Sequence, residues 1–350
     1  MYIRLTGRLL INVASLNTAG GAGTNYIEIT SVPIVIRTQQ GYELRASVPA
    51  ISGNMLKHYH FVHLVELLKD KYPEKFTDHD LRHVALRFPE GMKELETKSS
   101  NEKVELDDES KIIKNFVTAD LHGFLAPETQ CRRESLVKFS FLIPTEENVI
   151  EEKFGVDAVT HNRVVLNEKG CIIGEAGMMI VKRQYSSALF GFSSSLDLSL
   201  IGKPQADPNQ KPNLSKEEKM DRAWAAVIAF SKILYGELGA STSRALPIIT
   251  TEELVAFASE YQIPASVHGF YKDYLEANAN LFASYSKVLE RLKGKSKHGY
   301  IKALAYFRSD DRKNVLSKAL DKSSIETKLD YADPQMMLLD LAELIKSLNG

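Results

Sequence analysis

Apolar and polar residues alternate, or recur with helical spacing, through the first 71 residues and predict three strands and a helix. Residues 2–14 alternate as a half-buried strand does. Residues 26–37 and 42–48 have the composition of two further strands, joined at Gln40-Gly41. From about residue 53 to 71, apolar side chains cover most of a helix circumference. A helix of that kind is buried on most sides.

Further along the chain the pattern continues with a strand at 136–143, a long strand at 183–200, a helix at 216–238 and a short strand at 240–249. The helix opens on a capping box, Ser215-Lys-Glu-Glu218. Without the intervening segments, the order is strand, helix, strand, strand, helix, strand. This is the split βαβ, ferredoxin-like order, and also that of RNA-recognition domains. The order alone says little about function.

A second capping box, Thr250-Thr-Glu-Glu253, predicts another helix. From there to Leu348 the pattern is helical, with breaks at Ile263-Pro264, Gly294 and Asp333-Pro334. We therefore expect a C-terminal helical region packed on the core.

Two segments have the character of insertions. Residues 72–118 are rich in charges of both signs, with helical ends near 81–86 and 111–116 and a solvated loop between them. The acidic excess of that loop indicates that nucleic acid does not run over it. Residues 145–182 begin acidic and then form a β-hairpin on a long arm, turning at Asn167–Gly170.

Composition limits the classes of protein. Hydrophobic residues make up 44% and charged residues 25%, as in a globular protein. The net charge of −1 argues against a free-standing basic nucleic-acid binder, although one basic stripe is compatible with it. Cys131 and Cys171 form no C-x-x-C pair and no disulfide framework, which favours a reducing cytoplasm. There is no apolar run of ~18 residues and no signal-peptide pattern, so no membrane is expected.

The turn before the first helix is a candidate anion site. Ser52 or Asn54 can cap the helix, Gly53 lets another backbone approach, and Lys57 and His58 lie in or near the first turn. Free N–H groups and the positive end of the helix dipole suit a phosphate. An ordinary capped core helix is the alternative.

Other polar groups are less specific. The glycine-rich stretch 15–25 is neither a Walker motif nor a dinucleotide loop, and a hairpin connection explains it equally well. Arg132 and Arg133 could clamp phosphate, but neighbours on a strand face opposite ways, so only one of the two is expected to reach a ligand. His60 and His63 share a helix face without further ligands nearby, which favours core histidines over a metal site.

The sequence Val48-Pro-Ala-Ile-Ser-Gly-Asn-Met-Leu-Lys57 resembles the turn of the RAMP superfamily, the RNA-binding proteins of CRISPR systems. Further stretches, in colinear order, resemble the DevR-type backbone subunit of the archaeal type I-A surveillance complex, Cascade. They are Ile11–Gly21, Asp120–Leu125, Arg132–Ser140, His161–Val164, Tyr185–Phe192 with Leu196–Gly202, and Gly239–Pro247. The resemblance covers most of the chain and is weakest beyond about residue 265.

The resemblance implies an α+β fold: a modified RRM or ferredoxin-like palm with inserted finger and thumb regions and a C-terminal helical region. The palm would comprise residues 1–71, 119–144 and 183–250. The finger-like insertion would be 72–118, the thumb-like arm 145–182, and the helical region 251–350.

The resemblance also implies a function. Copies of the protein would stack helically along a CRISPR RNA, bind its backbone, and present its bases to target DNA, together with other Cascade subunits. No cofactor, metal or membrane is implied. A subunit that holds any guide needs phosphate contacts and no base code. The expected RNA-binding residues are Asn17, Ser52, Gly53, Asn54, Lys57, His58, His122, Arg132, Arg133, His161, Asn162, Arg163, Gln184, Tyr185, Ser243 and Arg244. For the three polar residues from His161 to Arg163, a solvated edge strand is the alternative.

Two other functions stay open. Related backbone subunits of type III systems cut bound RNA with an acidic residue, and Asp120 is the candidate acid here, although it lies outside the expected loop. A loop Asp is more often a turn or cap residue. A small-molecule enzyme with a phosphate site is the second alternative, but no nucleophile, base and orienting group occur at recognisable spacing. The sequence therefore favours a non-catalytic protein.

Overall fold

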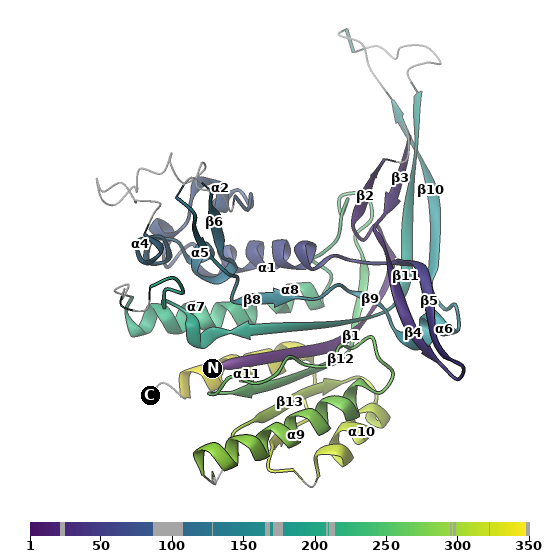
Figure 1. The fold of residues 1–350 in the computed structure, drawn as a ribbon. Coiled ribbons are helices and arrows are strands. Elements are labelled where there is room, and N and C mark those ends of the chain that lie inside the picture. The colour runs from purple at the N-terminus through teal and green to yellow at the C-terminus, as the bar shows by residue number, and fades with distance from the viewer. Residues whose placement is uncertain are drawn as a thin grey trace.

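A large mixed sheet forms the centre of this α+β molecule (Figure 1). The computed structural model describes residues 1–21, 25–86, 108–127, 129–164, 169–170, 178–207, 209, 214–294, 296, 299–321 and 323–347. Over these residues, ten strands join the main sheet and two hairpins form small sheets of their own. Helices cover both faces of the main sheet, and a long ribbon of two strands extends away from it.

The first strand lies in the middle of the sheet. β1 (Tyr2–Ala14) pairs antiparallel with β11 (Met178–Asp197) on one side and β12 (Ile248–Ser259) on the other. Beyond β11 lie β8 (Val137–Phe139) and β9 (Ile143–Pro144), both antiparallel to it. β12, β1, β11 and β8 are therefore consecutive neighbours, although they come from four separate parts of the chain.

Short strands extend both ends of the sheet. β13 (Lys302–Phe307) pairs antiparallel with β12, and β14 (Glu326–Lys328) pairs parallel with β13. At the other end, β3 (Tyr26–Ile29) lies parallel to β11, and β2 (Thr18–Gly21) pairs with β3. The glycine-rich stretch thus contributes a strand.

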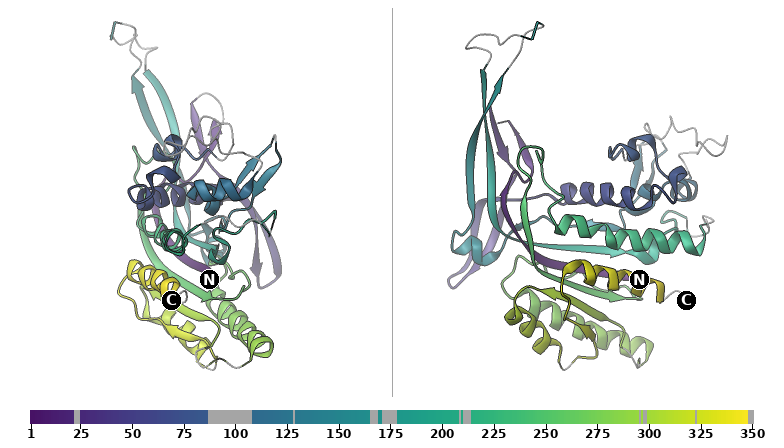
Figure 2. Two further views of the ribbon diagram at one scale, coloured as in Figure 1. Left: turned by 90° about the vertical axis from the view of Figure 1, so that its left-hand side faces the viewer. Right: turned by 180° about the vertical axis from the view of Figure 1, so that it is seen from behind.

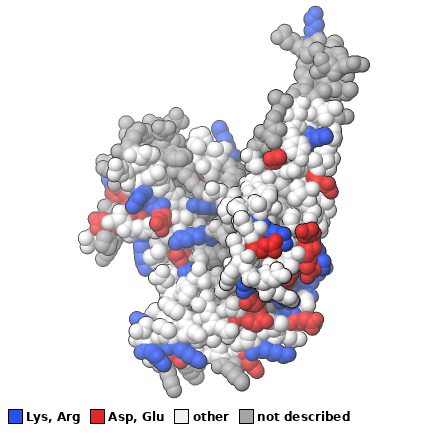
Figure 3. Space-filling model, turned by 45° about the vertical axis from the view of Figure 1, so that its right-hand side comes forward, with Lys and Arg blue, Asp and Glu red and all other residues white. Residues whose placement is uncertain are grey.

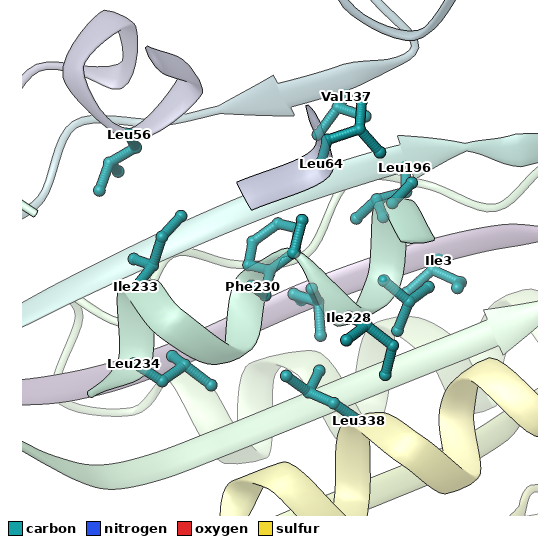
Figure 4. Packing of buried hydrophobic residues seen from close by; sticks show 14 of the residues in the cluster. Ile3, Leu56, Leu64, Val137, Leu196, Ile228, Phe230, Ile233, Leu234 and Leu338 are labelled. Carbon is teal, nitrogen blue, oxygen red and sulfur yellow. The ribbon is translucent and has the colours of Figure 1, made fainter. Parts of the chain in front are cut away.

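One face of the sheet carries the main core. It is covered by four helices, α1 (Gly53–Leu68), α7 (Lys216–Ile228), α8 (Phe230–Leu234) and α11 (Pro334–Ser347). Figure 4 shows side chains from three of these helices meeting side chains of the sheet: Leu64 of α1, Phe230 of α8, Leu338 of α11, Ile3 of β1 and Leu196 of β11. On the opposite face, α9 (Tyr274–Lys293) and α10 (Asp310–Leu320) pack over β12 and β13.

The predicted helix at Thr250 is wrong, because residues 248–259 form strand β12. Leu254 and Ala256 face the main core, whereas Val255 and Phe257 face the core under α9 and α10. A strand buried on both faces is apolar at every position, and periodicity alone does not separate it from a buried helix. The C-terminal region contains β13 and β14 between its helices, so it is not purely helical.

The segment between β12 and α9, residues 260–273, crosses the sheet without joining it. Side chains of β1 hold its carbonyl groups: Arg4 Nε donates to Pro264, Thr6 Oγ1 to Val267 and Arg8 Nε to Gly269, at 2.9–3.1 Å. At the crossing point, a Cβ added to Gly191 would lie 2.3 Å from the backbone carbon of Gly269. We call residues 260–273 the strap.

The arm predicted at 145–182 forms a two-stranded ribbon. After the short helix α6 (Glu146–Ile150), β10 (Gly155–Val164) pairs with the first half of β11, and both strands extend away from the body in every view (Figures 1 and 2). The predicted turn at 167–170 lies mostly outside the described residues. A second hairpin, β4 (Ser31–Thr38) with β5 (Gly41–Pro49), confirms the predicted strand pair.

The predicted insertion contains η1 (Pro73–Lys75), α2 (Asp78–Leu81) and α4 (Glu109–Asn115). The helix expected near 111–116 is confirmed, whereas most of 81–86 is not helical. Most of the acidic stretch at 102–109 lies outside the described residues. The chain then forms α5 (Val117–His122) and the hairpin of β6 (Phe124–Ala126) and β7 (Cys131–Arg133). No helix in the described ranges is long and apolar enough to cross a membrane.

Candidate functional site

Three segments distant in sequence meet at the N-terminus of α1. The Ser52 backbone N–H donates to Asn17 Oδ1 at 2.9 Å, which joins the α1 turn to the segment after β1. The Ala240 N–H donates to the Leu16 carbonyl at 2.7 Å, and Tyr59 Oη donates to the Gly239 carbonyl at 2.7 Å. These contacts bring residues 16–17, 52–59 and 239–244 together, and we call this arrangement the junction.

Ser52 caps α1, because its hydroxyl accepts a hydrogen bond from the Met55 N–H at 3.2 Å. Asn54, the alternative cap, is exposed instead. Gly53 is required by close packing: a Cβ there would lie 2.5 Å from the Phe139 carbonyl oxygen. The predicted close approach of another backbone is therefore confirmed, and its partner is β8.

The junction is electrostatically suited to an anion. The first turn of α1 carries no acidic residue. Lys57 and His58 are half-buried, and the His58 ring packs 5.6 Å from that of Tyr59 and 6.1 Å from that of Phe61. Ser243 and Arg244 are exposed on the loop whose Gly239 binds Tyr59. The structure thus brings together eight of the predicted residues: Asn17, Ser52, Gly53, Asn54, Lys57, His58, Ser243 and Arg244.

Unusual backbone geometry concentrates here. Val13, Leu16 and Ser241 have φ values of 51°, 39° and 55°. Positive φ is costly for residues other than glycine, and such residues persist where the surrounding structure fixes them, often at functional sites. The Leu16 and Ser241 conformations flank the hydrogen bond from Ala240 to Leu16, so the two loops fix each other.

The base of the ribbon holds three further predicted residues. His161 Nε2 and Tyr185 Oη are 2.8 Å apart, and the two rings pack edge to face. Gln184 uses both ends of its amide inside the protein: Oε1 accepts from the Ile29 N–H, and Nε2 donates to Tyr26 Oη. Its position therefore fits a structural tie between β11 and β3 better than a ligand contact. The side chains of Asn162 and Arg163 lie outside the described part.

Arg133 is a correction to the predicted site. Its guanidinium is buried and pairs with Glu109 at 2.9 Å and Asp120 at 2.7 Å, so it is not available to a phosphate. Arg132, on the opposite side of β7, is exposed, as the alternation of a strand predicts. Figure 1 shows the β6–β7 hairpin near the C-terminal end of α1, away from the junction.

His122 is a second correction. It is 2% exposed, and its Nε2 lies 2.9 Å from His60 Nδ1. His60 Nε2 in turn lies 2.8 Å from the Ala226 carbonyl, and burial lowers the pKa of His60 to about 3. His63 Nδ1 lies 3.1 Å from the Ala229 carbonyl. These contacts fit core histidines, of which His60 and His63 bind carbonyl groups. Among the described residues, no three possible ligands gather around one point.

Asp120, the candidate catalytic acid, is fully buried. Its Oδ1 lies 2.7 Å from Arg133, its Oδ2 lies 2.7 Å from Arg222, and both oxygens accept from the Gly202 N–H. A carboxylate with both oxygens engaged and no access to solvent is not placed to bind a metal ion or RNA. This observation removes the residue on which the nuclease alternative depended.

Sequence reasoning missed Tyr59 and Arg183, which lie at the junction and at the base of the ribbon. Neither residue belongs to a recognisable sequence motif, because the position of each depends on contacts with segments that are distant in the sequence. The surface seen in Figure 3 mixes Lys and Arg with Asp and Glu and shows no broad basic field. Any nucleic acid bound to that face would be held by individual side chains and not by a broad positive potential.

Comparison with known proteins identifies the family. The family model described as "CRISPR-associated negative auto-regulator DevR/Csa2" matches residues 5–279. The chain belongs to the DevR/Csa2 family. A relative from Methanocaldococcus jannaschii, "CRISPR-associated protein Cas7/Cst2/DevR", is 43% identical over 294 residues, covering 82% of this chain and 90% of the relative. A protein of the same name from Thermoproteus tenax is 33% identical, covering 82% and 84%.

A chain of a solved "CRISPR RNA-guided surveillance complex, pre-nicking" aligns with 99% of this DevR/Csa2 family member and with 100% of its own length. The TM-score is 0.49 and the identity 11%.

Proposed function

We propose that this protein is a non-catalytic CRISPR RNA-binding backbone subunit of a Cascade surveillance complex. The junction is the observation that carries this proposal. It presents a capped helix N-terminus whose first turn carries no acidic residue, together with Lys57 and His58 and the exposed Arg244. Such a site binds phosphate irrespective of base sequence, which is what a guide-independent scaffold needs.

Within this proposal, the split βαβ unit is the palm. The adjacency of β12, β1, β11 and β8, all antiparallel, is the order expected when two βα units interleave. α1 follows the first strand of this unit and α7 the third, and both lie on one face. The insertion at 72–118 would be the fingers and the ribbon within 145–182 the thumb.

We further propose that copies stack head to tail along the guide, which pairs with target DNA, and that other Cascade subunits complete the assembly. Residues 155–160 of the ribbon are exposed at every position. An isolated two-stranded ribbon is marginally stable in water, so a covering partner would stabilise it. A heterologous stack requires two different surfaces on each copy. The exposed ribbon offers one of these surfaces, and the part of the body that carries the junction offers the other.

Lys57→Ala in the full-length protein tests the junction. We expect weaker binding of several unrelated single-stranded RNAs by similar factors, and a salt dependence of the affinity that is shallower by about one counter-ion, because the lost contact is to phosphate. Affinities are measured by fluorescence anisotropy at several salt concentrations. Lys287→Ala, which removes an exposed lysine of α9, is the matched control and should leave both quantities unchanged.

Two results would contradict the proposal. A wild-type protein that purifies free of nucleic acid and binds none of the RNAs is not a guide scaffold. If Lys57→Ala changes the order of preference among the RNAs, the junction contacts bases and not the backbone. Cleavage of a complementary RNA in Mg²⁺ by the guide-bound protein would refute the non-catalytic assignment.

A further inference from the structure

Arg183 is an exception among the buried arginines. In the described part of the chain, five arginine side chains are buried, and four of them form ion pairs with carboxylates. The pairs are Arg4–Asp197, Arg8–Glu147, Arg133–Asp120 and Arg222–Asp120. Arg183 is only 8% exposed and pairs with no carboxylate of the described residues.

The hydrogen bonds of Arg183 do not compensate for the missing carboxylate. Its Nη1 donates to Ser15 Oγ at 3.3 Å, and its Nε is buried with no acceptor. A buried charge loses its hydration, and native proteins offset this loss with an opposite charge and full hydrogen bonding. Within the described residues, Arg183 therefore has neither an opposite charge nor full hydrogen bonding, and a bound anion would supply both.

The strand beside Arg183 is exposed on the face that it shares with Arg183. Arg183 lies opposite Val159 of β10 and opposite Ile27 of β3, and directly opposed residues point to the same side. Val159 is 49% exposed, so this face of the ribbon is accessible. Asp157 shares the face, opposite Tyr185, but is exposed and lies beyond ion-pair distance of Arg183.

The same face leads to the junction. The buried Ser15, whose hydroxyl accepts a hydrogen bond from Arg183, directly precedes Leu16 and Asn17 in the chain. The Leu16 carbonyl accepts from the Ala240 N–H, and Asn17 Oδ1 accepts from the Ser52 N–H. Tyr185 lies two residues further along β11, on the same side as Arg183, and its hydroxyl is hydrogen-bonded to His161. A guanidinium, a serine hydroxyl and an imidazole–phenol pair are donors that suit a phosphate, and the planar fork of Arg matches two phosphate oxygens.

We propose that Arg183 anchors a phosphate-binding site at the base of the ribbon and that a phosphate group is its counter-ion. The phosphate is a phosphodiester of bound RNA, which rests on the proposed function, or a free phosphate ion. This site on β11 is distinct from the N-terminus of α1. Ser15 connects it along the chain to Leu16 and Asn17 of the junction.

Arg183→Met tests the proposal in the full-length protein, with Lys182→Met as the control. Lys182 is the adjacent cation on β11, exposed and directed to the opposite face. Thermal unfolding is followed in a phosphate-free, low-salt buffer and again with added inorganic phosphate. Binding of a twelve-nucleotide oligouridylate is measured separately by fluorescence anisotropy.

Without added anion, Arg183→Met should unfold at or above the wild-type temperature, because an unpaired buried charge is replaced by an apolar side chain. Phosphate should raise the unfolding temperature of wild type and of Lys182→Met, but not that of Arg183→Met. RNA affinity should fall on the order of tenfold in Arg183→Met, the loss expected for one charge-assisted contact. If the phosphate response is lost and RNA affinity is unchanged, the ligand is free phosphate.

The proposal is overturned if Arg183→Met unfolds well below wild type without anion, or if it keeps the wild-type response to phosphate. These results do not depend on RNA. If wild type binds no RNA, the proposed function fails, and the phosphate measurements still decide the role of Arg183.

Discussion

The substitution Asp120→Asn separates a structural role of this acid from a catalytic one. Asp120 is fully buried and forms ion pairs of 2.7 Å with both Arg133 and Arg222. Arg133 also pairs with Glu109, and Arg222 also pairs with Glu218 and donates to the Ile113 carbonyl. The network joins α4, α5, β7 and α7, so it fixes the insertion to the helical face of the sheet.

The size of the effect follows from burial. Asparagine keeps the shape of the side chain but removes its charge, and two buried guanidinium groups then share one fewer carboxylate. Arg133 keeps Glu109 and Arg222 keeps Glu218, so neither guanidinium is left without a carboxylate. What is lost is the charge on the two hydrogen bonds to Asp120, about 1.5–3 kcal/mol each for a charged partner, or together about 3–5 kcal/mol because the asparagine amide keeps one acceptor oxygen. In a chain of this length, roughly 2 °C of unfolding temperature corresponds to each kcal/mol, so we expect a decrease of roughly 5–10 °C.

The assay is thermal unfolding by circular dichroism, with Glu217→Gln as the matched control. Glu217 pairs with Lys71 at 2.7 Å, but both side chains are largely exposed. An exposed pair contributes about 0–1 kcal/mol, so this variant should unfold close to wild type. RNA affinity of folded Asp120→Asn, measured below its transition, should be unchanged, because Asp120 does not reach the surface.

An unfolding temperature of Asp120→Asn within about 1 °C of wild type would refute the assignment of Asp120 as a structural ion-pair partner. A stable variant that has lost an RNA-cleaving activity of the wild type would restore the catalytic alternative.

Two further predictions concern the strap and the buried histidine. Gly191→Ala should lower the chemical-denaturation midpoint markedly, because the added Cβ would lie 2.3 Å from the backbone of Gly269. Gly155→Ala is the control and should change the midpoint little, because the space around Gly155 is open. Equal midpoints of the two variants would exclude a tight crossing of the strap over β11. Burial lowers the pKa of His60 to about 3, whereas the ordinary pKa of histidine is about 6.5. Between these two pH values the imidazole of His60 binds a proton in the unfolded chain but not in the folded protein. The contribution of neutral His60 to the free energy of unfolding is therefore complete above pH 6.5 and falls by up to about 1.4 kcal/mol per pH unit toward pH 3. In chemical denaturation, the stability of His60→Asn should fall less steeply with decreasing pH than that of the wild type. Identical pH profiles of the two proteins would contradict the prediction.

Local sequence determined the elements whose signal is local. The strand at 2–14, the helix after Ser52 and the hairpins at 26–48 and within 145–182 follow from alternation, capping and turn residues that act over a few positions. Alternation also predicted that only one of Arg132 and Arg133 would be accessible. The family resemblance rested on short motifs of this kind and was confirmed by the family match.

Tertiary structure decided which polar residues are available. Asp120 and Arg222 are 102 residues apart, and no local pattern shows that the fold pairs them and thereby buries Arg133. The strand at 248–259 looked helical because its second apolar face is covered by α9 and α10, which come later in the chain. Arg183 is distinguished only by the absence of a carboxylate among the described residues around it. Burial and ion pairing depend on distant neighbours, so sequence proposed the candidates and packing selected among them.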